Sequence, residues 1–446
     1  MKRFAVIAVM LVAAFSFGAS AQEPVEITFA HIFGGEQDSR VEVIRAIADE
    51  FQAANPGVTI TLVSPSTDYT ELFNSALLSA SQGDAPTIVQ VEEGLTQLAA
   101  DSQFFTPIGD LATPEQLASL DDVLPVVRSY YAIGDTLWSL PWNSSNPILF
   151  YNRGMFELAG LDPDTPPATF ADLTAACESI MSRREQLGVD ACVNWPMATW
   201  FVEQWVAMQD ALIANNDNGR TARASEMLYT DPAVKSVVEW WADLATKGFY
   251  TYSGTPNDYT GEGIAFLSKR TAITINSTAG ITLFNQFSVV QGIELGIAGL
   301  PVPNAEATNG GTVGGASVWI SAGATDAQKR AATDFLFFLT STENDIKWHK
   351  GSGYFPNRVT SIEALTAEGW FETAPAFGIA LGQLQAAGGT IANAGAVIGP
   401  SAEVRGFLVS AIQSIIDGGE TVDAALEAAK AQADATLADY NTLVGE

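Results

Sequence analysis

Apolar and polar positions near the start of the chain follow an alternating strand and helix order. Residues 25–33 (VEITFAHIF) alternate apolar and polar side chains, which predicts a strand, and residues 38–54 place apolar side chains on one helical face. The pattern then predicts a strand, a helix and a further strand at residues 58–63, 69–81 and 87–91. This β-α-β-α-β order predicts a parallel or mixed sheet covered by helices. In such open sheets ligands bind beyond the carboxyl ends of the strands, where Glu92-Glu93-Gly94 lies.

The alternation of extended and helical patterns continues along the chain. Residues 137–152 (LWSLPWNSSNPILFYN) predict two paired extended segments around a polar turn. Further strands are expected at residues 271–275 and 316–321, and the polar residues 276–280 predict a capped helix start with free backbone N–H groups. Segments with helical spacing are found at residues 170–184, 233–247, 326–340 and 402–443.

The first 21 residues have the pattern of a secretion signal. Two basic residues precede an apolar run at residues 4–17, and Ala19 and Ala21 have the A-x-A spacing of a cleavage site. The run is shorter than the roughly 20 residues that span a bilayer, which favours a removed signal over an anchoring helix. We therefore expect cleavage after Ala21 and a soluble periplasmic protein.

Composition indicates a folded, acidic protein of more than one domain. Hydrophobic residues make up 47% of the 446 residues and charged residues 16%, so substantial cores are expected. Since no Pro/Ser/Gly-rich linker separates the parts, we expect the chain to cross between domains at a hinge. The 51 acidic residues against 21 basic ones repel nucleic acid and anionic membranes, which argues against either as a partner.

The cysteines and histidines are too few for a metal or redox motif. Cys177 and Cys192 fit no zinc or thiol-redox spacing, and in an oxidising compartment we expect a disulfide, with two buried thiols as the alternative. His31 and His349 are the only histidines, so a histidine-based metal cluster is not expected. We expect neither a metal nor a cofactor.

An enzyme is the competing class of function. The paired carboxylates Glu92 and Glu93 could suggest a glycosidase. Adjacent residues at a strand end are expected to point to opposite faces, so these two should not flank one bond. The sequence also has no G-x-S-x-G elbow. We therefore predict that the protein is not an enzyme, with a secreted hydrolase as the less favoured alternative.

Several phrases, taken in order, resemble the family 1 extracellular solute-binding proteins of ABC importers. They are GDAPTIVQV at residues 83–91, LPWNSS at 140–145, AGLDP at 159–163, VGGASVW at 313–319 and GYFP at 353–356. The likeness covers essentially the whole chain after the signal and is nearest to members that bind glycerol-3-phosphate. It implies an α/β, two-lobed periplasmic-binding-protein fold of type II, like that of maltose-binding proteins, with the ligand cleft between the lobes.

The resemblance also implies the division of the chain and its partners. We expect lobe 1 to comprise residues 22–135 and 281–340, and lobe 2 residues 136–280 and 341–446. The implied partners are a small polyol phosphate and the membrane permease subunits of an ABC importer, and we expect a monomer. The implied function is capture of glycerol-3-phosphate and/or glycerophosphodiesters by hinge closure.

Seven positions correspond to the ligand contacts of such relatives. They are Tyr69, Glu93, Ser145, Ser277, Gly315, Tyr354 and Arg405. Arg405 would supply a charged donor to the phosphate, the serines and Tyr354 neutral donors, and Gly315 a backbone N–H. Glu93 would repel a phosphate, so it is expected to accept hydrogen bonds from glycerol hydroxyls beside Tyr69.

Each of these positions also has a structural interpretation. Ser277 could cap a helix, Tyr354 could pack in a core, and Arg405 could pair with a nearby acid. Trp195 and Trp200 could stack on the ligand, although packing in the core is the favoured interpretation. An oligosaccharide-binding protein of the same fold is the alternative function, and it would need a sugar-stacking aromatic platform.

Overall fold

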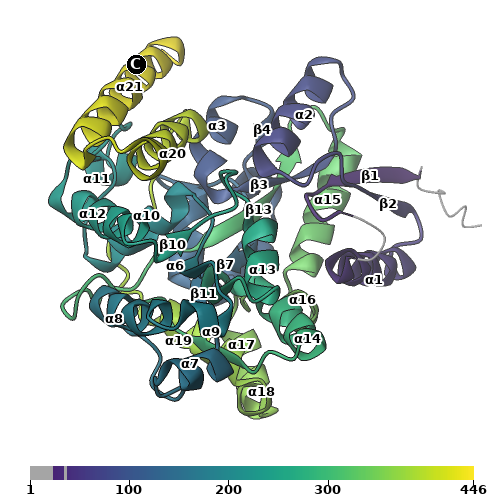
Figure 1. The fold of residues 1–446 in the computed structure, drawn as a ribbon. Helices are drawn as coiled ribbons and strands as arrows, with labels where there is room; N and C mark the ends of the chain where they lie inside the picture. The colour runs from purple at the N-terminus through teal and green to yellow at the C-terminus, as the bar shows by residue number, and fades with distance from the viewer. Residues whose placement is uncertain (1–23, 35–37, 446) are drawn as a thin grey trace, which may run out of the picture.

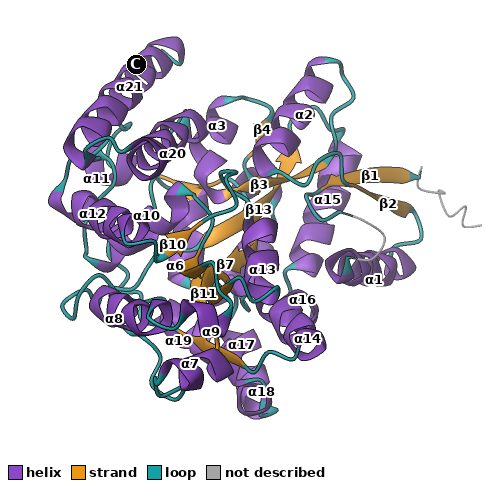
Figure 2. Ribbon diagram, in the orientation of Figure 1, coloured by secondary structure: helices purple, strands orange, loops and turns teal. Residues whose placement is uncertain are grey.

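The computed structural model describes residues 24–34 and 38–445. The predicted signal at residues 1–21 and its cleavage site lie outside these ranges. Two β-sheets, each covered by helices, form the two lobes of the molecule (Figures 1 and 2). Within the described ranges we find no helix with the length and apolar character needed to span a membrane.

The first sheet holds the N-terminal strands together with one strand from much later in the chain. Its order is β2-β1-β3-β13-β4, and β7 also pairs with β13. The first three strands are parallel, whereas β13 runs antiparallel to β3. The bounds are β1 (Val25–Ala30), β2 (Val58–Val63), β3 (Ile88–Glu92), β4 (Phe105–Thr106), β7 (Leu140–Ser145) and β13 (Gly314–Ser321). The prediction of a parallel or mixed sheet is confirmed, and the sheet is mixed.

The second sheet has the order β10-β9-β11-β8-β12. Strand β11 is antiparallel to β8 and parallel to β9. The bounds are β8 (Pro147–Asn152), β9 (Ala191–Asn194), β10 (Tyr250–Thr251), β11 (Thr271–Ser277) and β12 (Leu295–Ala298). A separate two-stranded ribbon is formed by β5 (Ala132–Ile133) and β6 (Thr136–Leu137).

The chain passes from the first sheet to the second across a single residue, Asn146, between β7 and β8. The predicted pairing of these two extended segments is therefore wrong, because β7 pairs with β13 while β8 pairs with β11 and β12. A period-two pattern predicts a strand but carries no information about its partner. The expected lobe boundaries at residues 136 and 281 place β7 in lobe 2 and β12 in lobe 1. In the structure β7 lies in the first sheet and β12 in the second.

Helices cover both faces of the two sheets. On the first sheet, α1 and α15 pack on one face and α2 and α3 on the other. The bounds of the helices around this sheet are α1 (Ser39–Ala54), α2 (Tyr69–Ser81), α3 (Thr96–Asp101), α15 (Asp326–Leu339) and α16 (Thr342–Ser352). Those around the second sheet are α8 (Phe170–Met181), α10 (Thr199–Met208), α12 (Pro232–Thr246), α13 (Tyr259–Leu267), α14 (Ile281–Gln291), α19 (Pro375–Gln385), α20 (Ser401–Gly418) and α21 (Val422–Leu443).

The remaining short helices connect these layers. They are α4 (Ile108–Leu111), α5 (Pro114–Ala118), α6 (Pro125–Arg128), α7 (Arg153–Ala159), α9 (Arg184–Leu187), α11 (Asn215–Gly219), α17 (Val359–Ala367) and α18 (Trp370–Thr373). The C-terminal helices α20 and α21 close the core of the second lobe with α10 and α12 (Figure 1). Cys177 of α8 and Cys192 of β9 form a disulfide in this lobe, as expected.

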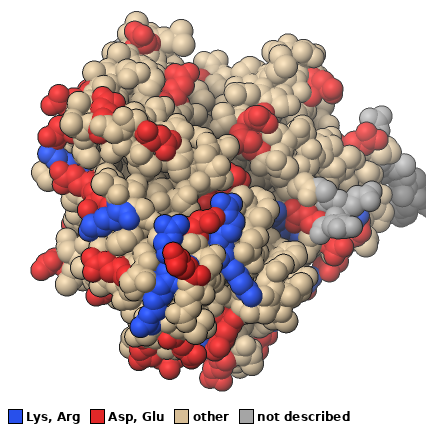
Figure 3. Space-filling model, in the orientation of Figure 1, with Lys and Arg blue, Asp and Glu red and all other residues tan. Residues whose placement is uncertain are grey.

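The acidic surplus is visible on the surface. On the face shown in Figure 3, acidic side chains are spread over both lobes, while basic side chains gather in the lower half. The charge that a bound ligand experiences therefore depends on the few ionised groups beside it, since exposed charges farther away are screened by salt.

Candidate functional site

The first lobe contributes two carboxylates at the end of β3. Glu92 is the last residue of the strand, and the 3₁₀ turn η1 (Glu93–Leu95) begins directly after it. Because this turn breaks the alternation of the strand, both side chains reach the same guanidinium group, that of Arg405. The prediction that they point to opposite faces is therefore wrong. A side chain on Gly94 would collide with that guanidinium, so the glycine makes the approach possible.

Gly315 brings a backbone donor to Glu93. It has φ +109°, and a Cβ at this position would collide with the carbonyl oxygen of Asn143 on β7. Both features favour glycine, because this backbone conformation is strained for other residues. Its N–H donates a hydrogen bond to Oε2 of Glu93 at 3.0 Å. One oxygen of the buried carboxylate is thus held by the main chain of β13.

The second lobe contributes Arg405 of α20 and Glu203 of α10. The guanidinium donates twice to Glu203, from Nε to Oε1 at 2.8 Å and from Nη2 to Oε2 at 2.7 Å. The same Nη2 lies 3.2 Å from Glu93, and Nη1 lies 3.7 Å from Glu92. One cation therefore lies among three carboxylates, two from the first lobe and one from the second.

This arrangement shifts the ionisation of the buried groups. Burial, together with the neighbouring Glu92, raises the pKa of Glu93 above its usual range, although Arg405 acts in the opposite direction. Burial likewise raises the pKa of Glu92, again opposed by Arg405. The phenols of Tyr130 and Tyr259 have raised pKa values because they are buried close to the same carboxylates. If all three carboxylates were ionised, they would carry more negative charge than the single cation balances, so the buried Glu92 and Glu93 hold protons more readily than exposed carboxyls do.

Tyr69 is positioned by its helix and by hydrogen bonds that run through the buried amide side chains of Gln90 and Asn143. Asp68 caps α2 and so fixes Tyr69 as the first helical residue. Nδ2 of Asn143 donates to the Tyr69 hydroxyl at 2.9 Å, and Nε2 of Gln90 donates to Oδ1 of Asn143 at 2.9 Å. Burial and the neighbouring Tyr354 raise the pKa of Tyr69, so its hydroxyl keeps its proton.

The other expected residues lie around this centre. Ser145 ends β7 directly opposite Gly314 of β13. Tyr354 is buried, and its ring stacks on Trp348 with the ring centres 5.6 Å apart, so it also belongs to the aromatic core. The Ser277 hydroxyl accepts from the N–H of Ala279 at 3.2 Å, which is the capping role considered from the sequence.

Trp195 and Trp200 lie in different surroundings in the structure. Trp195 is fully buried against Trp205, Trp241 and Tyr250, so it is a core residue. Trp200 packs directly against Gly314, and its buried indole N–H has no hydrogen-bond partner. The buried indole N–H of Trp195 also lacks a partner, so it is the position of Trp200 against Gly314 that makes it a candidate ligand contact. Sequence reasoning favoured the core for both.

Glu203 was missed from the sequence. It lies in a helix whose other residues from Thr199 to Met208 are all buried, and it is the only acid among them. A single carboxylate inside such an apolar helix was the available signal, because buried charges are rare unless paired.

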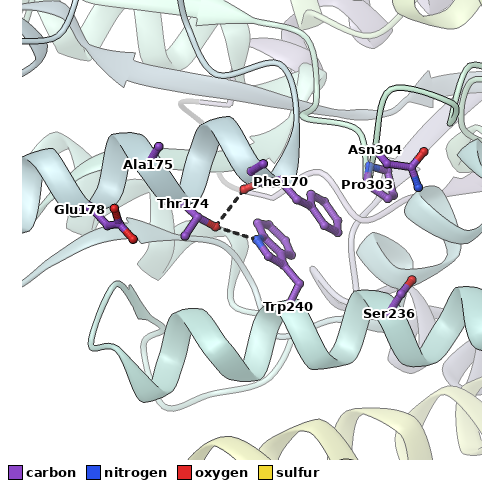
Figure 4. Close-up of a pocket in the computed structure, with 9 residues that line it drawn as sticks. Phe170, Thr174, Ala175, Glu178, Ser236, Trp240, Pro303 and Asn304 are labelled. Atoms are coloured by element: carbon purple, nitrogen blue, oxygen red, sulfur yellow. Dashed lines mark hydrogen bonds between the residues drawn. The ribbon is translucent and has the colours of Figure 1, made fainter.

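A hollow on the surface of the second lobe does not have the features of this site. It measures about 510 Å³ and lies between α8 and α12 (Figure 4). Two of the polar side chains shown there are already paired, since the Trp240 indole donates to Thr174 and Thr174 donates to the carbonyl of Phe170. The hollow is lined by the second lobe alone. Among the described residues we find no group of three or more His, Cys, Asp or Glu side chains placed to hold a metal.

Comparison with known families identifies the class of protein. The model of the bacterial extracellular solute-binding proteins matches residues 46–378. The chain belongs to this family. A curated relative, the sn-glycerol-3-phosphate-binding periplasmic protein of Yersinia pseudotuberculosis, is 26% identical over 429 residues, which is 95% of this chain and 94% of the relative. The protein of that name in Rhizobium meliloti is 27% identical over 95% of this chain and 96% of its own length.

Solved structures of other solute-binding proteins share the fold. UgpB from Mycobacterium tuberculosis, in complex with glycerophosphocholine, superposes with a TM-score of 0.76 at 17% identity and covers 94% of this chain and all of its own (100%). The cyclic alpha-maltosyl-1,6-maltose binding protein from Arthrobacter globiformis has a TM-score of 0.73 at 21% identity, over 93% of this chain and 99% of its own. The fold is therefore the two-lobed, maltose-binding-protein-like fold expected from the sequence.

Proposed function

We propose that this solute-binding protein is the periplasmic capture subunit of an ABC importer for glycerol-3-phosphate or its diesters. The observation that carries the proposal is the convergence of hydrogen-bonding groups from both lobes at one place. Glu93 and Gly315 come from the first lobe, and Arg405 comes from the second. A ligand that contacts both sets stabilises the closed arrangement, which is the basis of capture by hinge closure.

The chemistry of these groups suits a polyol that carries an acidic group. A carboxylate such as Glu93 accepts hydrogen bonds from hydroxyls, and Tyr69 lies on the same side of the site. Arg405 provides the donors that Glu203 leaves unused, chiefly those of Nη1, and Trp200 provides an unpaired indole N–H. The names of the curated relatives, and the ligand of the Mycobacterium tuberculosis structure, support glycerol phosphates as the first ligands to test.

A second candidate ligand is an oligosaccharide. The observation that favours it is the charge of the site, since three carboxylates already surround Arg405. Aromatic rings beside the site would also suit a sugar face: the ring centres of Trp200 and Tyr259 are 6.2 Å apart, and Tyr130 is close to the same carboxylates.

Calorimetric titration of the purified protein separates these candidates. We expect heat of binding with glycerol-3-phosphate or glycerophosphocholine and none with maltose. Heat with maltose alone would replace the glycerol phosphate proposal with the oligosaccharide one. Glu93→Gln provides a site control, because loss of the carboxylate should weaken recognition of the hydroxyls for either class of ligand.

A further inference from the structure

The pairing of Arg405 with Glu203 does not depend on closure of the lobes. Both residues lie on helices of the second lobe, and the hydroxyl of Thr199 on α10 donates to the backbone carbonyl of Arg405 on α20 at 2.9 Å. The two helices are thus joined beside the ion pair. Glu203 accepts both bonds in the parallel, two-point geometry that gives the strongest pairing of arginine with a carboxylate.

The ion pair is shielded from water. The exposed fraction is 18% for the side chain of Arg405 and 11% for that of Glu203, and closure adds Glu93, at 3%. Removing a charged group from water costs free energy unless an opposite charge and hydrogen bonds compensate it. Arg405 is compensated by Glu203 before any ligand arrives, so it offers a ligand the remaining hydrogen-bonding capacity of its guanidinium rather than a free positive charge.

The charge of a ligand therefore matters at this position. The pair of Arg405 and Glu203 has no net charge, and Glu92 and Glu93, whose pKa values are raised, add negative charge to the extent that they are ionised. A phosphate monoester adds about −1.5 to −2 charges at neutral pH, whereas a diester adds one and a hydroxyl none. Repulsion among buried like charges disfavours the monoester most.

We propose that Glu203 is a specificity-determining residue that neutralises Arg405 and makes the site select neutral or singly charged ligands over dianionic phosphate monoesters. The inference rests on the proposed function and narrows its ligand to the glycerophosphodiesters. The unpaired indole N–H of Trp200, on the same helix as Glu203, supplies a neutral donor that suits such a ligand.

The test compares the Glu203→Gln variant with the wild type and with Glu403→Gln, which removes one negative charge from the exposed side of α20. At pH 7.5 we expect the wild type to bind glycerophosphocholine about tenfold more tightly than glycerol-3-phosphate, and Glu203→Gln to tighten glycerol-3-phosphate binding by about tenfold, equivalent to about 1.4 kcal/mol. Glu403→Gln should leave the ratio unchanged. An unchanged ratio in Glu203→Gln overturns the inference, as does a wild type that prefers the monoester.

A second measurement on the wild type guards against misfolding of the variant. The second pKa of a phosphate monoester is about 6, so lowering the pH from about 7.5 to about 5.5 removes one ligand charge, while a diester is unaffected. We expect the preference for the diester to shrink at the lower pH. The diester serves as the reference for changes in the protonation of Glu92 and Glu93 over this range, whereas the phenols of Tyr130 and Tyr259 keep their protons throughout. A preference that does not shrink contradicts the inference.

The inference can fail separately from the proposed function. If the wild type binds neither glycerol phosphate, the proposed function fails, and inorganic phosphate becomes the probe of Glu203. A gain of phosphate binding in Glu203→Gln over both the wild type and Glu403→Gln still supports the role of Glu203. No gain overturns it.

Discussion

The ionic cluster at the site and a second ionic cluster between the lobes differ in their balance of charge. At the site, Arg405 is shared by Glu92, Glu93 and Glu203. At the second cluster, Asp101 of α3 receives two hydrogen bonds from Arg223, at 2.6 and 2.8 Å. The hydroxyl of Tyr440 on α21 donates to the same carboxylate at 2.7 Å, and Gln97 donates at 2.9 Å.

The net pKa shifts of Asp101 and Glu93 have opposite directions, although burial acts in the same direction on both. Burial alone would raise the pKa of Asp101, but the hydrogen bonds from Arg223, Tyr440 and Gln97 outweigh it, and the net pKa is lowered. At the site, burial and the neighbouring carboxylate prevail, and the pKa of Glu93 is raised. A fully paired carboxylate such as Asp101 serves structure, whereas an incompletely paired group such as Glu93 retains capacity for a ligand.

The largest effect is expected from removing the shared cation. Arg405→Met leaves three carboxylates facing one another, and loss of one partner from a buried ion pair costs about 3–5 kcal/mol. We expect a decrease of this size in the free energy of unfolding, measured with denaturant at pH 7.5. The double variant Arg405→Met/Glu203→Gln should regain part of the loss. A loss below about 1 kcal/mol in the single variant would mean that the carboxylates relax or protonate easily.

Disruption of the balanced cluster should affect closure without changing selectivity. Asp101→Asn removes charged hydrogen bonds worth about 1.5–3 kcal/mol. We expect weaker binding of every ligand by one common factor, in contrast to the changed ratio expected for Glu203→Gln. Asp121→Asn is the matched control, because this side chain is 86% exposed and lies 3.5 Å from Arg128. A ligand-dependent factor for Asp101→Asn would show that the two clusters are coupled.

The pH dependence of stability should also distinguish the clusters. Because folding raises the pKa of Glu93, the stability due to this group is present at low pH and declines as the pH rises above about 4.3. Folding lowers the pKa of Asp101, so the stability due to this group is present at higher pH and is lost as the pH falls below about 3.9. We expect the melting temperature of the wild type to decrease by a few degrees between weakly acidic and weakly alkaline pH. The decrease should be smaller in Glu93→Gln. Identical profiles for both proteins would remove Glu93 as the cause.

The smallest effect is expected from Tyr440→Phe. This variant removes one hydrogen bond to Asp101 but leaves Arg223 in place, so we expect a loss of about 1 kcal/mol in the free energy of unfolding. Thermal melting of the variant beside Asp101→Asn is the measurement. A loss as large as that of Asp101→Asn would show that Tyr440, rather than the ion pair, holds the cluster.

Local features of the fold were predictable from the sequence, whereas partners distant along the chain were not. The strand at residues 58–63 and the helix at residues 69–81 have the predicted bounds, because their periodicity and caps are local signals. The segments that became β7 and β8 were predicted to be extended but to pair with each other, since their sheet partners lie far along the chain. Predictions based on resemblance named Glu93 and Arg405, whereas Glu203, despite its place as the one acid of an otherwise buried helix, was recognised only as their spatial neighbour.

The late position of β13 has a consequence for how the protein matures. This strand lies between β3 and β4 in the first sheet, although about 220 residues separate it from β3 along the chain. The core of the second lobe likewise includes Leu426 and Leu437 near the end of the chain. The first sheet therefore cannot be completed before β13 has been synthesised, and the core of the second lobe cannot be completed before α21 has been. Folding that waits for distant segments is slow, so the newly made chain stays open for longer and is accessible to chaperones and proteases.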